Sequence, residues 1–308
     1  MKKTELVGIE ALQDKTELCL FTNSVENEKA VSVVIIGEPE SAKTELMKKY
    51  RNNNGVYARR TCTAYSVIQD LKDNKIKIRE SDKQIGHLVI YDLSDFFAYA
   101  PKTVNQGVQF LCAFTEEGLS QQGAYWVKSE DTKGLVGVKG GLIAGVTPFG
   151  FFTKRGKVRA NLFKGGFLSR LLPFSISYST SHVSKIFDSI RKQEYHVGKG
   201  FVDTIELNIP TEPVEVAISK THRKRLEDLA KDVSREISYQ LDGKGQYKSY
   251  GFRLYKSLIS LAKASALRDG RTRVRRKDIG RIKYLSHWMN LKMNSLNQEY
   301  PTDFRKYV

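Results

Sequence analysis

A short apolar run followed by a glycine-led loop is the feature that most constrains how this chain folds. Residues 31–36 read VSVVII, and residues 37–44 read GEPESAKT. A continuous run rich in β-branched residues is typical of a strand that is buried on both faces of a parallel sheet. The residues after the loop, 44–51, are good helix formers. The sequence therefore predicts a strand, a tight loop and a helix in direct succession, as in an α/β layered domain.

The loop from Gly37 to Thr44 follows the phosphate-binding pattern G-x-x-x-x-G-K-[ST], except that Ala42 replaces the second glycine. In such a loop, backbone N–H groups hold the phosphates, the lysine reaches the β- and γ-phosphates, and the hydroxyl binds Mg²⁺. Ala42 is compatible with this pattern if its φ is negative. We therefore expect ATP, with Mg²⁺ on Thr44, to be bound by Gly37, Pro39, Ser41, Ala42, Lys43 and Thr44.

Strand and helix candidates alternate along the first two thirds of the chain. The strand candidates are residues 55–63, 87–92, 141–147 and 173–179, and the helix candidates are residues 105–117 and 182–191. Apolar residues then recur at helical spacing in residues 220–239, 250–268 and 274–288. We predict an α/β nucleotide-binding domain at residues 1–205 and a small, basic, all-helical domain at residues 206–308.

The charge of the chain is strongly positive and unevenly distributed. The net charge is +17, and residues 211–308 contain 22 Lys and Arg against 11 Asp and Glu. This excess predicts a polyanionic partner, most simply DNA, although a solvated basic surface remains an alternative. The densest basic run extends from Arg268 to Lys277, where we expect phosphate contact, with a solvated loop or a subunit interface as alternatives. A second basic group lies at residues 154–159.

Neither a membrane span nor a disulfide framework is expected. Three cysteines are too few and too scattered for a disulfide or zinc framework, and a reducing compartment fits them best. No apolar run follows the first three residues. Residues 134–152 are apolar but rich in glycine, which indicates a buried strand with loops. We expect a cytoplasmic protein.

Several motifs together resemble the core of the minichromosome-maintenance (MCM) AAA+ helicases, with the MoxR-type AAA+ ATPases as near relatives. The phosphate loop shares with them an alanine before the lysine and a proline two residues after the first glycine. Other segments follow in the order of that family, over about residues 30–285. They resemble Walker B at 86–95 (GHLVIYDLSD), the helix and insert hairpin at 110–126, sensor 1 at 141–148 (GLIAGVTP), the arginine finger at 167–174 (FLSRLLPF) and the sensor 2 helix at 252–262 (FRLYKSLISLA).

The resemblance implies a P-loop domain with a parallel sheet flanked by helices, a small helical lid, and an ATPase that assembles as a hexameric ring or filament. It also implies roles for four residues. Asp92 would bind Mg²⁺ through water, and Thr147 would occupy the sensor 1 position. Arg170 would be the arginine finger that serves the nucleotide of the next subunit, and Arg253 would be the sensor 2 arginine.

Two departures from the family concern hydrolysis. Leu93 stands where the family has the glutamate that polarises the attacking water, and Thr147 stands where the family has asparagine. Loss of a general base and of a water-positioning group costs about 10²–10⁴-fold in rate. Asp95, or Glu116 or Glu117 from the following helix, could replace the missing carboxylate. We therefore expect ATP binding, with hydrolysis that is weak or depends on a partner.

Three function classes remain open. The first is a DNA-dependent MCM-like helicase or translocase core that forms a ring. The second is an ATP-gated DNA-binding assembly factor with weak or no hydrolysis, and the third is a MoxR-like protein remodeller. The positive charge favours the first two, and Leu93 and Thr147 favour the second over the first. A separate protein could supply further DNA-binding or catalytic parts.

Overall fold

The chain folds around a parallel β-sheet. The computed structural model describes residues 8–97, 99–120, 134–148, 166–192, 204–242, 251–295 and 301–308. The strands are β1 (Val33–Gly37), β2 (Val56–Arg59), β3 (Gln84–Ile90), β4 (Lys139–Val146), β5 (Leu172–Ser177) and a two-residue edge strand, β6 (Asn294–Ser295). Their order is β2-β3-β4-β1-β5-β6, and every neighbouring pair is parallel. The predicted α/β class is confirmed.

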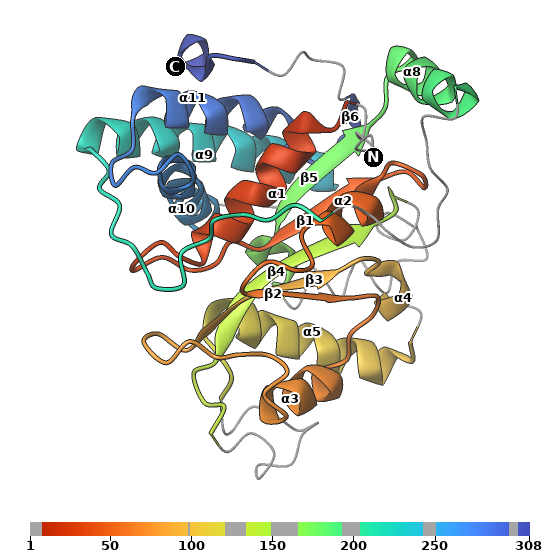
Figure 1. Ribbon diagram of the computed structural model, residues 1–308, viewed down its shortest axis with the longest axis vertical. Coiled ribbons are helices and arrows are strands. Elements are labelled where there is room, and N and C mark those ends of the chain that lie inside the picture. The colour runs from red at the N-terminus through yellow and green to blue at the C-terminus, as the bar shows by residue number, and fades with distance from the viewer. Residues whose placement is uncertain are drawn as a thin grey trace.

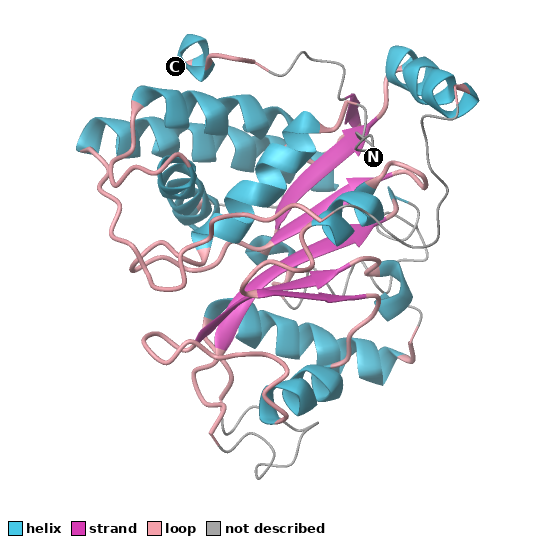
Figure 2. Cartoon of the chain, viewed as in Figure 1, coloured by secondary structure: helices cyan, strands magenta, loops and turns pink. Residues whose placement is uncertain are grey.

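Helices cover both faces of the sheet (Figures 1 and 2). One face carries α1 (Glu10–Thr22), α2 (Lys43–Lys49), α9 (Lys220–Asp242), α10 (Phe252–Arg268) and α11 (Arg276–Leu285). The other face carries α3 (Ala64–Lys72) and α5 (Pro101–Glu116). The remaining described elements are α4 (Ser94–Phe97), α8 (Thr180–Arg191) and the short turns Leu168–Arg170, Ser286–Trp288 and Phe304–Tyr307. In Figure 1, α8 stands apart from the other helices.

Side-chain alternation along β1 explains its continuous apolar sequence. Val33 and Ile35 pack into the hydrophobic cluster on the α1 face, while Val34 and Ile36 pack into the cluster on the α5 face. All five residues of β1 are buried. A strand covered on both faces has no polar side, which is why the run lacks alternation.

The helices after residue 219 share their core with α1. Leu226 of α9, Leu258 of α10 and Ile282 of α11 belong to the same hydrophobic cluster as Leu12 and Leu18 of α1. The chain then returns to the sheet, where β6 pairs with β5. The boundary at residue 205 stays a prediction.

Among the described residues, no helix is both long enough and apolar enough to span a membrane. Cys19, Cys62 and Cys112 form no disulfide with one another. Most of the predicted apolar segment at 134–152 is described, and its centre is the buried strand β4.

Candidate nucleotide-binding site

The carboxyl ends of β1, β4 and β3 form one row at the edge of the sheet. Ile36 pairs with Val146, and Ile90 pairs with Ala144. Beyond this register, the N–H of Leu93 donates to the carbonyl oxygen of Gly145 at 2.7 Å. The loop that follows β1, Asp92 after β3 and Thr147 after β4 therefore meet at the same edge. Crevices at this edge of a parallel sheet are where ligands bind in α/β folds.

Gly37 ends β1 at a point where no side chain fits. A Cβ atom there would lie 2.8 Å from Ser41 Oγ and 3.1 Å from Ile176 Cγ1. Glu38, Pro39 and Glu40 are exposed, whereas Ser41 is buried beneath them. The loop is thus a tight turn whose tip faces solvent.

The ammonium group of Lys43 lies inside this turn. Its Nζ donates hydrogen bonds to the carbonyl oxygens of Gly37 (2.6 Å) and Glu38 (2.7 Å) and to Ser41 Oγ (2.8 Å). The side chain is buried, and burial lowers the pKa of Lys43 to about 8, although the charges of Asp92 and Glu38 oppose that shift. The ammonium group that would contact a phosphate is therefore hydrogen-bonded to oxygens of the loop itself. A bound phosphate must displace some of these oxygens.

Ala42 has a left-handed backbone, with φ 58° and ψ 8°. The condition of a negative φ, under which alanine would fit the pattern without strain, is not met. Glu40 is also left-handed, with φ 65°. The left-handed region costs a residue with a Cβ atom about 1–2 kcal/mol, because the Cβ approaches the following carbonyl oxygen. This geometry accounts for the glycine in the usual pattern, and Ala42 retains the geometry at a cost in strain.

Thr44 and Asp92 are the two oxygen donors that could hold Mg²⁺ here. Thr44 is the second residue of α2, and both side chains are partly exposed at the same edge of the sheet. Mg²⁺ in phosphate sites takes one or two protein ligands together with phosphate oxygens and water. Within the described ranges, no group of three His, Cys, Asp or Glu could hold a metal by itself. One hydroxyl and one carboxylate fit a metal that arrives with a nucleotide.

The position after Asp92 faces the core. Leu93 is 1% exposed and packs in the cluster on the α5 face together with Phe96. Asp95 is exposed on α4, and its Oδ2 lies 3.9 Å from Arg60 Nε. Thr147 is partly exposed directly after β4. Asp95 is thus the nearest carboxylate in sequence that could act in place of the missing glutamate.

Arg170 and Arg253 lie at the opposite edge of the sheet. Arg170 stands two residues before Leu172, which pairs with Val33 at the start of β1, whereas the phosphate loop begins at the end of β1, Gly37. Four residues of strand span about 13 Å. The structure therefore separates the two arginines from the phosphate loop of their own chain.

Glu116 joins the two arginines. Its Oε2 lies 2.6 Å from Arg170 Nε, and its carboxylate accepts from Arg253 Nε at 2.7 Å and Nη2 at 3.1 Å. Arg253 Nη1 also donates to Ser169 Oγ at 3.0 Å. Burial alone would raise the pKa of Glu116, but the hydrogen bond from Arg253 and the charges of both arginines hold that pKa below its usual value.

Glu116 and Glu117 were alternatives to Asp95 for approaching the γ-phosphate, and the structure places them away from the phosphate loop of the same chain. Helix α5 runs back from the end of β3 and ends near the start of β4, so Glu116 and the adjacent Glu117 lie at the far edge. No sequence pattern indicated the link between Glu116 and the arginines, because Arg253 is 137 residues away.

The basic run from Arg268 to Lys277 is divided between the interior and the surface. Arg268 pairs with Asp14 at 2.5 Å and Glu17 at 2.9 Å of α1. Arg271 pairs with Asp278 at 2.7 Å, and Lys277 pairs with Asp269 at 2.7 Å. The exposed arginines of the run are Arg273, Arg275 and Arg276. Only this second group is available to a partner.

Two predicted segments fall outside the described residues: the second half of the insert hairpin, from residue 121 to 126, and the basic group at 154–159.

No protein-family model matches the chain, and no curated protein matches it significantly. The likeness to MCM proteins therefore rests on the motifs themselves.

Proposed function

We propose that the protein binds ATP with Mg²⁺ in the loop from Gly37 to Thr44 and works on DNA as a ring-forming AAA+ core of MCM-like type. One observation carries the nucleotide site: Lys43 Nζ lies within 2.6–2.8 Å of three loop oxygens, between a buried strand and a helix. An ammonium group held this way is positioned to exchange those oxygens for phosphate oxygens.

The roles follow from position at the sheet edge. Backbone N–H groups of the loop contact the phosphates, Lys43 contacts the β- and γ-phosphates, and Thr44 and Asp92 hold Mg²⁺. When bound, Mg²⁺ neutralises part of the phosphate charge. Thr147 lies beside Asp92 and can donate one hydroxyl to the γ-phosphate or to water.

Arg170 and Arg253 serve a nucleotide bound by a neighbouring copy. Their separation from the loop of their own chain supports this role, because neither could reach its own γ-phosphate without a large rearrangement. Glu116 positions both guanidinium groups until a phosphate competes for them. An arginine supplied in this way stabilises charge in the transition state of phosphoryl transfer.

A second candidate function is an ATP-gated DNA-binding assembly factor with little turnover. The burial of Leu93 favours it, because the position of the missing glutamate points into the hydrophobic cluster and not toward the phosphate loop. A MoxR-like remodeller of a protein partner is the third candidate, and the basic surface favours it least.

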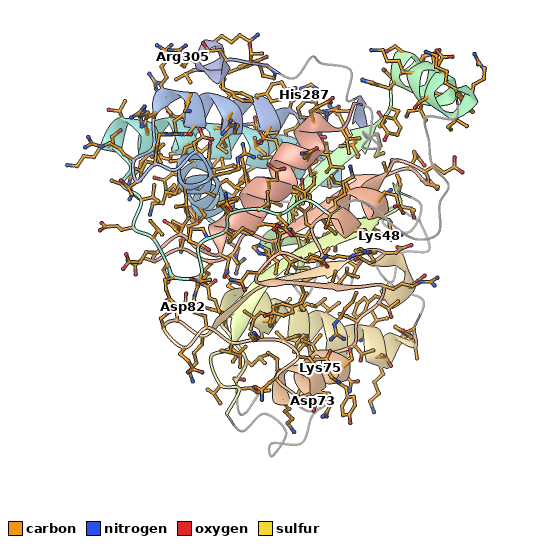
Figure 3. The ribbon with its side chains drawn as sticks, viewed as in Figure 1. Lys48, Asp73, Lys75, Asp82, His287 and Arg305 are labelled. Atoms are coloured by element: carbon orange, nitrogen blue, oxygen red, sulfur yellow. The ribbon has the colours of Figure 1, made fainter. Side chains whose placement is uncertain are left out.

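Nucleotide binding is tested by titrating the protein with a fluorescent ATP analogue and Mg²⁺. We expect Lys43→Ala to weaken affinity at least about tenfold, the loss of one charge-assisted contact. Lys48→Ala is the matched control, because Lys48 is a partly exposed lysine on the same helix, labelled in Figure 3. If wild-type protein fails to bind, or if both variants lose affinity equally, the nucleotide site is wrong.

The candidates are separated by measuring ATP turnover and particle size with and without duplex DNA. Turnover stimulated by DNA supports the motor. ATP-dependent assembly on DNA without turnover supports the assembly factor, and indifference to DNA supports the remodeller.

A further inference from the structure

The start of α9 and the loop between α10 and α11 lie side by side. Ala217, three residues before α9, forms a parallel bridge with Arg273. The N–H of Ala217 donates to Thr272 O at 2.9 Å, and the N–H of Val274 donates to Ala217 O at 2.9 Å. Both helices start at the left margin of the molecule in Figure 1. Two basic segments that are about fifty residues apart in the sequence are therefore brought together at one end of the helical region.

We call this surface the α9/α11 patch. Its members are exposed basic side chains: Lys220, Arg223, Arg225, Arg273 and Arg275. In the described part of the chain, none of them forms an ion pair with a carboxylate. This leaves the patch with five charges that can be neutralised by a partner.

Three of the carboxylates close to the patch already have partners, whereas the exposed Glu215, two residues before Ala217, forms no ion pair among the described residues. Asp278 pairs with Arg271, and Asp269 pairs with Lys277. On α9, Glu227 accepts from Lys224 at 3.2 Å. These pairs do not offset the five exposed charges, and Glu215 can offset one of them, so the patch keeps a net positive charge.

We propose that the α9/α11 patch binds the phosphate backbone of double-stranded DNA. Four of its five members are arginines, whose planar fork matches phosphate oxygens. Backbone contacts of this kind supply affinity and positioning without reading sequence. The choice of DNA as the partner rests on the proposed function. The geometry of the patch does not depend on nucleotide binding.

The side chains absent from the patch favour a duplex over other polyanions. The large apolar side chains that are exposed in the described chain lie elsewhere: Tyr65, Tyr99, Val136, Val183, Phe187, Ile190, Tyr239 and Phe252. Binding to a membrane surface needs apolar side chains that enter the lipid. Binding to single strands uses aromatic rings that stack on the bases. A duplex backbone needs neither.

Helix α10 separates the patch from the arginine pair. Its first turn carries Arg253, and its last residue, Arg268, leads into the loop of the patch. Seventeen residues of helix span about 25 Å. DNA on the patch would therefore leave Arg253 accessible.

The test measures binding of a fluorescent 30-base-pair duplex of mixed sequence over a range of salt. The test variant combines Arg223→Ala, Arg225→Ala, Arg273→Ala and Arg275→Ala. We expect at least about a tenfold loss of affinity and a salt slope that is smaller by up to about 3.6, because each of the four lost phosphate contacts contributes about 0.9 to that slope.

The matched control removes four exposed charges from other elements, through Lys75→Ala, Lys102→Ala, Lys185→Ala and Lys192→Ala. Lys75 is labelled in Figure 3 beside α3, at the other end of the molecule from α9. We expect affinity within about twofold of wild type. Replacing the four patch arginines by lysine should keep most of the salt slope, which confirms that charge carries the binding.

Three outcomes would overturn the proposal: equal losses in the patch and control variants, tighter binding to a single strand of the same length, or binding to phosphatidylserine vesicles but not to duplex.

The nucleotide site is tested separately. Lys43→Ala should leave duplex affinity unchanged, and the patch variant should keep affinity for the ATP analogue, so either claim can fail alone.

Discussion

Arg253 and Glu116, 137 residues apart in the sequence, are joined by two hydrogen bonds, from Nε to Oε1 at 2.7 Å and from Nη2 to Oε2 at 3.1 Å. The same carboxylate lies 2.6 Å from Arg170 Nε. One side chain of α5 thus connects the start of α10 with the segment before β5. This three-residue cluster is one charged link between the helical region and the far edge of the sheet, and Lys263 of α10 forms another with Glu28 at 2.6 Å.

Removing Glu116 tests that link. We expect Glu116→Ala to lower the free energy of unfolding by about 1–2 kcal/mol, because two guanidinium groups lose their carboxylate while solvent partly compensates. Urea denaturation measures the change. Glu117→Ala, at an exposed neighbouring position, should change stability by less than about 0.5 kcal/mol. Equal effects of the two substitutions would show that the cluster contributes nothing specific.

The left-handed Ala42 gives a prediction about the phosphate loop. Ala42→Gly removes the Cβ atom from a backbone with φ 58°, so we expect affinity for the ATP analogue to stay the same or to increase. Ala42→Val places a β-branched side chain in the same backbone, and we expect at least about a tenfold loss. The opposite order of affinities would show that the nucleotide-bound loop uses a different backbone at this residue.

Burial of Leu93 gives a prediction about hydrolysis. Leu93→Glu restores the residue type of the MCM pattern, but it places a carboxylate at a position that is 1% exposed. We expect a loss of about 3 kcal/mol or more in unfolding free energy and no gain in ATP turnover. Leu93→Met is the control for packing and should cost less than about 1.5 kcal/mol. A stable Leu93→Glu protein with faster turnover would instead show that the side chain can turn toward the nucleotide.

Local sequence was sufficient for most strands and helices, because each carries its own pattern of apolar residues. The run at 31–36 became β1 with a shift of two residues at its start, and residues 105–117 fall almost wholly within α5. Helix α1 was not predicted. Asp14, Lys15 and Thr16 are buried in it, so its sequence lacks the one-sided apolar pattern of a surface helix.

The candidate site likewise has one part that the sequence indicated and another that it did not. The phosphate loop is made of consecutive residues, so its spacing was visible in the sequence. The arginine cluster depends on Glu116, which only the fold brings to Arg170 and Arg253. Likewise, no pattern within the basic run showed that Arg268 pairs with α1 and is turned inward, whereas Arg273 remains exposed.

Lys15 is a fully buried lysine whose Nζ has no hydrogen-bond acceptor among the described residues. Burial lowers its pKa from 10.5 to about 8, with the charges of Cys19 and Asp14 acting in the opposite direction. Between pH 8 and pH 10.5 the unfolded chain therefore holds a proton that the folded chain has released. The free energy of unfolding therefore rises with pH across that window, by up to about 3 kcal/mol from this group, because unfolding takes up a proton.

Lys15→Met removes the buried amine but keeps a long side chain of similar shape. We expect the variant to be more stable than wild type at pH 7–8, and the difference to shrink as the pH approaches 10.5. Urea denaturation at several pH values measures it, and subtracting the two curves removes the titration of most other groups. Lys48→Met, at a partly exposed site on α2, is the control for the loss of a lysine charge. A pH-independent difference for Lys15→Met would mean that Lys15 keeps an ordinary pKa, with its ammonium group reaching water.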